Sequence, residues 1–130
     1  MLINSYITAP AGGAAGSVPL FWWQGWSRHW YLMSVFPLKR FECPERGAFV
    51  VVRREPDGER TPLMVGTASN VGEELYCEHG DALMKAIKAG ANEVHVHLAA
   101  ENDYQRAAAM GDIARGWDMR AEYGKGYVYA

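Results

Sequence analysis

The sequence predicts an α/β domain with a small mixed, mainly antiparallel sheet that is flanked by helices. Three observations favour this class. The chain has 130 residues, which suits a single domain. Apolar stretches rich in β-branched residues fall near residues 29–38, 46–54 and 92–98, as expected for core strands. Two further stretches, 82–89 and 101–115, carry the caps and the spacing that are typical of helices.

The N-terminal part of the chain divides into two segments. Residues 1–20 are rich in small residues and show no apolar periodicity, so we expect a flexible leader ahead of one domain at residues 21–130. The segment FWWQGWSRHWY, Phe21 to Tyr31, then holds four of the five tryptophans. We call it the Trp-rich segment and interpret it as a lid or edge strand packed on the core. The alternatives are a surface for a protein partner or for self-association, and a platform for stacked bases.

The strands follow from apolar pattern and turn chemistry. HWYLMSVFPL, at 29–38, reads as a strand that ends at Pro37. RGAFVVVRR, at 46–54, is apolar on both faces, which predicts a central strand. EPDGERT supplies a turn, and PLMVG returns as the second strand of a hairpin. NEVHVHL, at 92–98, alternates and predicts another core strand.

The helices are placed by their capping residues. Asn70 opens a capping-box-like pattern that predicts a helix over 70–78. Asp81 and Gly90 bracket a second helix, ALMKAIKA. A third helix is predicted over 101–115, and the tail EYGKGYVYA is open to a short strand or to no regular structure. The predicted order is therefore β-β-β-α-α-β-α.

Composition narrows the function classes. A net charge of -2 and an isoelectric point of about 6.1 weigh against tight, non-specific binding of nucleic acid. Two cysteines, Cys43 and Cys77, are ordinary for a reduced protein, and we expect no disulfide. The N-terminus lacks a basic region followed by an unbroken apolar core, and no apolar run approaches the roughly 18 residues of a membrane span. We expect a cytoplasmic protein that does not associate with membranes.

One family is similar to this chain over most of its length. The stretches GAFVVVRREPDGERTPLMVGTASNVGEELYCEH, IKAGANEVHVHL and RAAAMGDIARGW occur in this order between about residues 46 and 117. Together they resemble the GIY-YIG nuclease superfamily, in particular a bacterial branch of it. The resemblance implies a GIY-YIG-like fold. In active members it implies two catalytic tyrosines, an arginine on the first helix and a glutamate that holds one divalent metal.

The two tyrosines of the family have no counterpart here. The GIY triplet corresponds to GAF, which ends at Phe49, and the YIG triplet corresponds to MVG, which begins at Met64. Phenylalanine keeps the ring but has no hydroxyl, and a methionine thioether moves no proton. Neither residue can act as the base that hydrolysis of a phosphodiester needs.

The cation and the metal ligand of the family are also replaced. The helix arginine corresponds to Glu74, which reverses the charge, and the metal glutamate corresponds to Met110, a poor ligand for Mg²⁺. His79 stands in a recognisable family position and is a possible remnant of the site. We therefore expect no catalytic residues and no metal or other cofactor.

Two further groups of residues are candidates for binding. His95 and His97 share one face of their predicted strand and, with His79 and Cys77, could form a soft metal site; histidines on a polar sheet face are the simpler interpretation. The nucleic-acid-binding candidates are Arg53, Arg54, Lys85 and Lys88, for which solvated surface charge is the simpler interpretation.

The sequence thus favours a catalytically degenerate GIY-YIG-like domain that acts as a binding or regulatory module. A protein partner, or a second copy of the chain, is favoured over nucleic acid, with the Trp-rich segment as the contact surface. The first alternative is a Mg²⁺-dependent DNA endonuclease that uses His79, Asp112 and either Tyr76 or Tyr104. The second alternative is a nucleic-acid binder that does not cleave.

Overall fold

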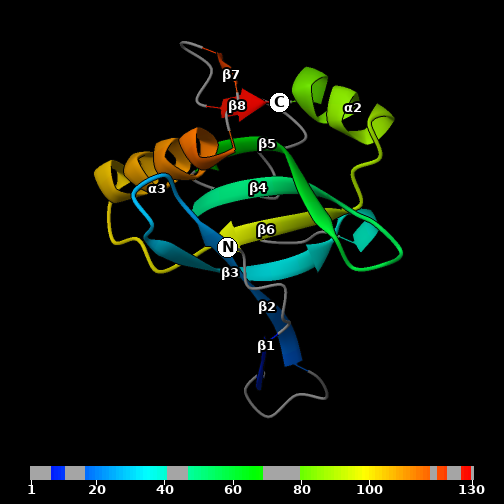
Figure 1. Cartoon of the computed structure of the whole chain (residues 1–130), viewed down its shortest axis with the longest axis horizontal. Helices are drawn as coiled ribbons and strands as arrows, with labels where there is room; N and C mark the ends of the chain where they lie inside the picture. The colour runs from blue at the N-terminus through cyan, green and yellow to red at the C-terminus, as the bar shows by residue number, and fades with distance from the viewer. Residues whose placement is uncertain are drawn as a thin grey trace.

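The computed structural model describes residues 7–10, 17–40, 47–68, 80–117, 120–122 and 127–129. The elements, in chain order, are β1 (Ile7–Pro10), β2 (Ser17–Gln24), β3 (Trp30–Pro37), the 3-10 helix η1 (Leu38–Arg40), β4 (Gly47–Arg54), β5 (Arg60–Ala68), α2 (Gly80–Lys88), β6 (Glu93–His97), α3 (Asp103–Gly116), β7 (Arg120–Glu122) and β8 (Tyr127–Tyr129). The strands form one sheet in the order β1-β2-β3-β6-β4-β5-β8-β7, accompanied by the two helices (Figure 1). The predicted α/β class is confirmed.

Strand β4 lies in the middle of the sheet, between β5 and β6, as its two apolar faces predict. The β4–β5 hairpin shifts register between Val51 and Val52, where a bulge adds a residue to β5. Every strand pair among the described residues is antiparallel, so the prediction of a mixed sheet is wrong for this part of the chain. β4 pairs with β5 through the hairpin on one side and with β6 on the other, both antiparallel, so no parallel crossover joins neighbouring strands here.

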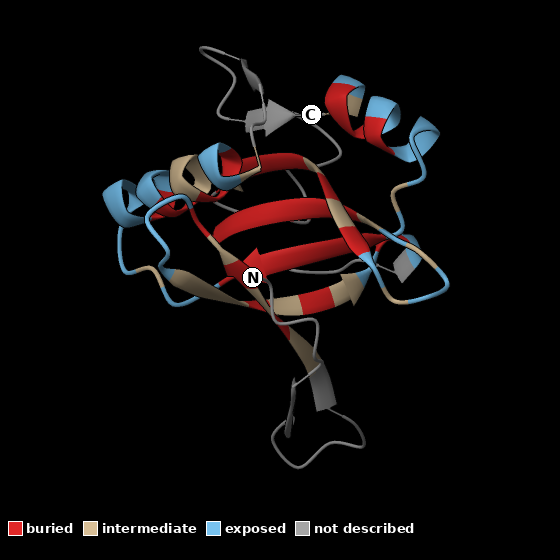
Figure 2. Ribbon diagram, viewed as in Figure 1, coloured by how far each residue is buried: buried red, intermediate tan, exposed pale blue. Residues whose placement is uncertain are grey.

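The sheet has a core on each face, and each core is covered by a different helix (Figure 2). On the first face the side chains of β4, β5 and β6 pack against α2; this α2-side core contains Phe49, Val51, Met64, Val94, Val96, Leu83 and Ala86. On the second face β2, β3, β4 and β5 pack against α3; this α3-side core contains Phe21, Trp23, Met33, Val50, Val65, Ile113 and Ala114. Successive residues of β4 enter opposite cores, because strand side chains alternate.

The end of α2 at Gly90 agrees with the sequence, but Asp81, the predicted cap, lies inside the first turn of α2. Gly90 follows α2 with a φ of 100°, and the amide of Ala91 donates to the carbonyl of Ala86 at 2.9 Å, which closes the helix. Asn102 caps α3, because its side chain accepts from the amide of Gln105 at 2.8 Å. The helix predicted over 70–78 lies outside the described residues. In the part of the chain that is described, no helix has the length and apolar character needed to cross a membrane.

The interpretation of residues 1–20 as a flexible leader is wrong for the eight of them that the structure describes. Residues 7–10 form β1, and residues 17–20 begin β2, whose register places Ile7 opposite Leu20. The sequence argument rested on the shortage of large apolar side chains. Strand pairing is made by backbone groups, which every residue except proline offers in full.

Candidate functional site

The positions of the two family tyrosines are part of the core. Phe49 and Met64 are both fully buried in the α2-side core. Their neighbours in the sheet and on α2 are apolar, so neither side chain borders an open site. The structure brings these two predicted site residues into the same core, where they pack against apolar side chains and line no surface concavity.

Met110 does not join Phe49 and Met64. It packs, half buried, against the α3-side core, on the opposite face of the sheet. The counterparts of the family's site residues therefore do not converge on one place, because α3 packs on the sheet face opposite to the one that Phe49 and Met64 occupy. The remaining candidates, Glu74, Tyr76, Cys77 and His79, lie outside the described residues.

The nuclease alternative also named Asp112 and Tyr104. Both oxygens of the Asp112 carboxylate are occupied: Oδ1 accepts from the Ser27 amide at 2.8 Å, and Oδ2 accepts from Ser27 Oγ at 2.5 Å and from the Tyr31 hydroxyl at 2.8 Å. Tyr104 is 83% exposed at the start of α3. Asp112 is thus a structural acceptor, engaged with the hairpin and not with Tyr104.

The four basic candidates have different neighbours in the structure. Arg53 forms an ion pair with Glu55 at 2.7 Å and donates to the carbonyl of Ala89. Arg54 lines a different region, a pocket that contains two glutamates. Lys85 and Lys88 are exposed on α2. Arg53 thus reaches the C-terminal end of α2, which carries Lys88, whereas Arg54 lines the pocket with the two glutamates.

A buried chain of polar side chains crosses the α3 side of the sheet, and sequence reasoning missed it. Arg60 Nε donates to Glu93 Oε1 at 2.9 Å. Trp23 Nε1 donates to His95 Nδ1 at 2.8 Å, so the ring proton of the neutral histidine sits on Nε2 and points to Glu93 Oε1, 3.0 Å away. The four side chains come from β2, β5 and β6. The spacing of Glu93, His95 and His97, which puts them on one strand face, is the sequence signal that could have revealed them.

Burial sets the protonation states in this chain of side chains. Desolvation is the largest influence on His95 and lowers its pKa, against the opposing influence of Glu93. Burial also tends to raise the pKa of Glu93, but the hydrogen bonds from His95 and Arg60 outweigh it and hold that pKa below its ordinary value. The expected polar sheet face is therefore wrong: His95 is a neutral core residue and Glu93 is an ionised one.

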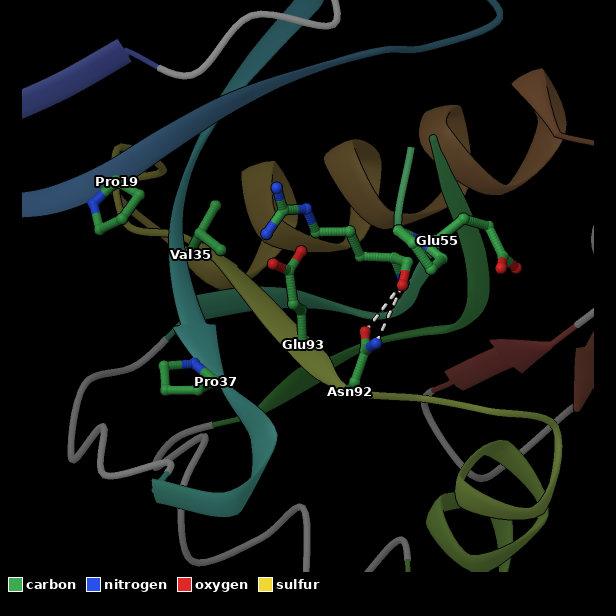
Figure 3. Close-up of a pocket in the computed structure, with 8 residues that line it drawn as sticks. Pro19, Val35, Pro37, Glu55, Asn92 and Glu93 are labelled. Atoms are coloured by element: carbon green, nitrogen blue, oxygen red, sulfur yellow. Dashed lines mark hydrogen bonds between the residues drawn. The ribbon is translucent and has the colours of Figure 1, made fainter. Parts of the chain in front are cut away.

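The Glu93 carboxylate also borders a pocket at the end of β4 and β6. Its cavity volume is about 500 Å³, and it is lined by Pro19, Val35, Pro37, Arg54, Glu55, Pro56, Asn92 and Glu93. Figure 3 shows the Glu93 carboxylate directed into this space, while Asn92 is bonded to the backbone of Arg54. The depressed pKa makes Glu93 a fixed negative charge and a poor proton acceptor.

A second pocket lies between the β2–β3 hairpin and the start of α3. Its cavity volume is about 530 Å³, and we call it the aromatic pocket. It is lined by Trp22, His29, Trp30, Tyr31, Leu32, His97, Ala99, Ala100, Gln105, Ala108 and Ala109. Four of these residues belong to the Trp-rich segment, so the structure places part of that segment around a cavity and another part, Phe21 and Trp23, in the core. The predicted packing on the core is confirmed for Phe21 and Trp23, but the prediction of an edge strand is wrong for them, because β2 lies between β1 and β3.

The hairpin that forms one wall of this pocket is tied to α3 through Asp112. Besides the three bonds to the carboxylate, the amide of Trp26 donates to the carbonyl of Asp112 at 2.9 Å. Gly25 lies against the same carboxylate, and a Cβ at this position would overlap it. Burial and the bond to Asp112 raise the pKa of the Tyr31 hydroxyl to about 12, so this donor keeps its proton. The loop geometry therefore depends on one side chain of α3.

Asp112→Asn is expected to lower the free energy of unfolding by about 1–3 kcal/mol, because the amide presents a donor where Ser27 and Tyr31 also donate. Thermal unfolding at neutral pH measures this loss. Hydrogen bonds from Ser27 and Tyr31 outweigh burial and lower the pKa of Asp112, so the stabilisation is present above the ordinary value of 3.8 and disappears as the pH falls through the folded value. Glu101→Gln, at an exposed carboxylate outside this contact, is the control. Equal stability of both variants would contradict the tether.

The soft metal site considered from the sequence does not assemble from the described histidines. Both ring nitrogens of His95 are engaged, by Trp23 and by Glu93. His97 directs Nδ1 to the carbonyl of Leu32 at 2.9 Å. No group of three or more potential ligands is found within the described ranges.

Comparisons with family models, with curated proteins and with solved structures give no match for this chain. The GIY-YIG resemblance therefore stays a prediction from sequence motifs. What the chain does has to be argued from the geometry of its described residues.

Proposed function

We propose that this chain is a catalytically inactive GIY-YIG-like domain that works as a binding module, with a protein as its partner. The single observation that carries the proposal is the aromatic pocket, a cavity of about 530 Å³ built largely from the Trp-rich segment. Cavities of this size with apolar and aromatic walls and a few polar groups are the usual form of a binding site.

The burial of Phe49 and Met64 supports the absence of nuclease chemistry. Both family tyrosine positions are closed off from solvent and carry no ionisable group. Met110, at the position of the metal ligand, lies on the other side of the sheet. A nuclease of this mechanism needs a base, a cation and a metal around one phosphate. With apolar residues at two of these positions, and the third on the other sheet face, we expect no hydrolysis.

The chemistry of the aromatic pocket supports a protein partner over nucleic acid. Neither lysine nor arginine is among the described residues that line it. Binding of nucleic acid draws most of its affinity from cations placed against phosphates. Aromatic walls with few charges are instead enriched at the centres of protein interfaces.

Two measurements on the purified chain test the proposal. Plasmid DNA incubated with Mg²⁺ or Mn²⁺ is expected to stay uncut, beside an active GIY-YIG nuclease as a positive control. Selection from a displayed library of random peptides is expected to yield peptides that bind the folded chain. Cleavage that is abolished by His79→Ala would replace the proposal with the nuclease alternative, and a library without binders would remove the protein-binding part.

A further inference from the structure

His97 lines the aromatic pocket, and one of its two ring nitrogens is bonded to the backbone. Its side chain is 9% exposed and lines the cavity. Nδ1 lies 2.9 Å from the carbonyl oxygen of Leu32, which only accepts, so Nδ1 is the donor of this bond, and a ring with a single proton carries it there. Nε2 then holds a lone pair, for which the described part of the chain supplies no donor. The ring is also held by an edge-to-face contact with Tyr31, with centroids 5.5 Å apart.

Two other polar atoms of the pocket lining already have partners. The Tyr31 hydroxyl donates to Asp112 at 2.8 Å, and Gln105 Oε1 accepts from the amide of Glu101 at 2.7 Å. The remaining walls are aromatic rings, Leu32 and small alanine side chains. The pocket therefore matches a flat aromatic group with one hydrogen-bond donor and no charge. Indole fits this description, because its N–H is a donor and the ring has no acceptor to satisfy.

The edge of β3 beside the pocket favours an occupant that is part of a polypeptide. β3 pairs with β6 from Ser34 to Pro37, and along the same edge residues 30–33 pair with no strand of the described ranges. The carbonyl of Leu32 points to this side, as its contact with His97 shows. Because the N–H and C=O groups of one residue point the same way in an antiparallel strand, the Leu32 amide faces this side as well. An extended peptide can pair with such an edge while a side chain enters the cavity beside it.

We propose that the aromatic pocket receives the side chain of a tryptophan from the partner protein, and that His97 Nε2 accepts the indole N–H. The inference rests on the proposed binding function and adds the residue that the module recognises. Trp22, Trp30 and Tyr31 supply the aromatic walls, and α3 closes the opposite side with Ala108 and Ala109.

A pair of probes with the same shape tests the hydrogen bond without changing the protein. N-acetyltryptophanamide is titrated into the labelled chain and followed by NMR, beside the analogue in which benzothiophene replaces indole and the N–H is lost. The tryptophan amide is expected to shift the signals of Ala99 and Ala108 and to bind about two- to tenfold tighter than the analogue, the range of one neutral hydrogen bond. Equal or tighter binding of the analogue would overturn the role of His97.

Two neighbouring alanines provide the matched variants. Ala107 and Ala108 are both exposed on α3, but Ala108 lines the pocket and Ala107 does not. Ala108→Phe is expected to abolish binding of the tryptophan probe and of tryptophan-containing peptides from the library, while Ala107→Phe leaves both unchanged. Selected peptides that lack tryptophan and bind Ala108→Phe as well as the wild type would contradict this inference but not the proposed binding function. Plasmid cleavage, by contrast, would contradict the proposed function, whether or not the tryptophan probe binds.

Discussion

Replacing Glu93 with alanine is expected to lower the free energy of unfolding by about 3–5 kcal/mol, the cost of removing one partner from a buried ion pair. The carboxylate accepts from Arg60, which is 5% exposed, and from His95, which is fully buried. The Arg60 guanidinium also lies 4.7 Å from the centre of the Phe21 ring, so its position is fixed from both sides. Loss of the carboxylate removes the acceptor that Arg60 Nε and His95 Nε2 share. Urea denaturation with a linear extrapolation measures the change.

Two variants separate this effect from the mere loss of a negative charge. Glu93→Gln keeps an acceptor for the buried donors and is expected to cost less than Glu93→Ala. Glu55→Ala breaks the Arg53–Glu55 pair, whose side chains are 37% and 43% exposed, and is expected to cost at most about 1 kcal/mol. A Glu93→Ala protein as stable as Glu55→Ala would contradict the buried chain.

The pH dependence of this effect has a defined sign. Because the pKa of Glu93 is lowered, its contribution is complete above the ordinary value of 4.5 and is lost as the pH falls through the folded value. His95 acts in the same direction: burial lowers its pKa, so below the ordinary value of 6.5 the unfolded chain takes up a proton that the folded ring refuses. The wild-type chain should therefore lose stability as the pH falls from about 6.5, and the gap to Glu93→Ala should narrow at the acid end.

Met64→Tyr is expected to destabilise the fold by roughly 2–6 kcal/mol, although tyrosine is the residue of the resembling family at this position. Met64 is completely buried among apolar side chains. A larger side chain overpacks a filled core at a cost of about 1–3 kcal/mol. A hydroxyl buried without a partner adds about 1–3 kcal/mol.

Met64→Leu is the control, because it conserves volume and is expected to cost less than about 1.5 kcal/mol. Thermal and urea unfolding of both variants provide the comparison. A Met64→Tyr protein as stable as the wild type would mean that the position borders a polar concavity, and the idea of a vestigial catalytic site would return.

The sequence predicted those parts of the fold that are written in local patterns. The double-sided apolar run of β4, the alternation in β6 and the glycine that ends α2 are each local features, so periodicity and turn chemistry find them. The strand pairing of residues 7–10 has no such pattern, because its backbone partners, and not its side chains, decide it.

The candidate site depended on contacts that no local pattern carries. Arg60 meets Glu93 across 33 residues, and Trp23 meets His95 across 72. Met110 lies on a helix whose buried positions are Arg106, Ala109, Ile113 and Ala114, with one large apolar residue among them, so the sequence does not indicate which sheet face the helix covers. Sequence reasoning did find the Trp-rich segment, but could not divide it into Trp23 in the core and Trp22 and Trp30 at the pocket.

The bond between Ser27 and Asp112 joins residues 85 positions apart in the chain. This separation determines at which stage of folding the aromatic pocket forms. One wall belongs to a hairpin near the start of the chain, and the other belongs to α3, the last described helix. Closing such a long loop costs conformational entropy before the contact is gained, so we expect this contact to form late in folding. A growing or truncated chain that ends before α3 has the tryptophans without the cavity. A partner that needs this cavity therefore distinguishes a chain that has folded with α3 from one that ends before it.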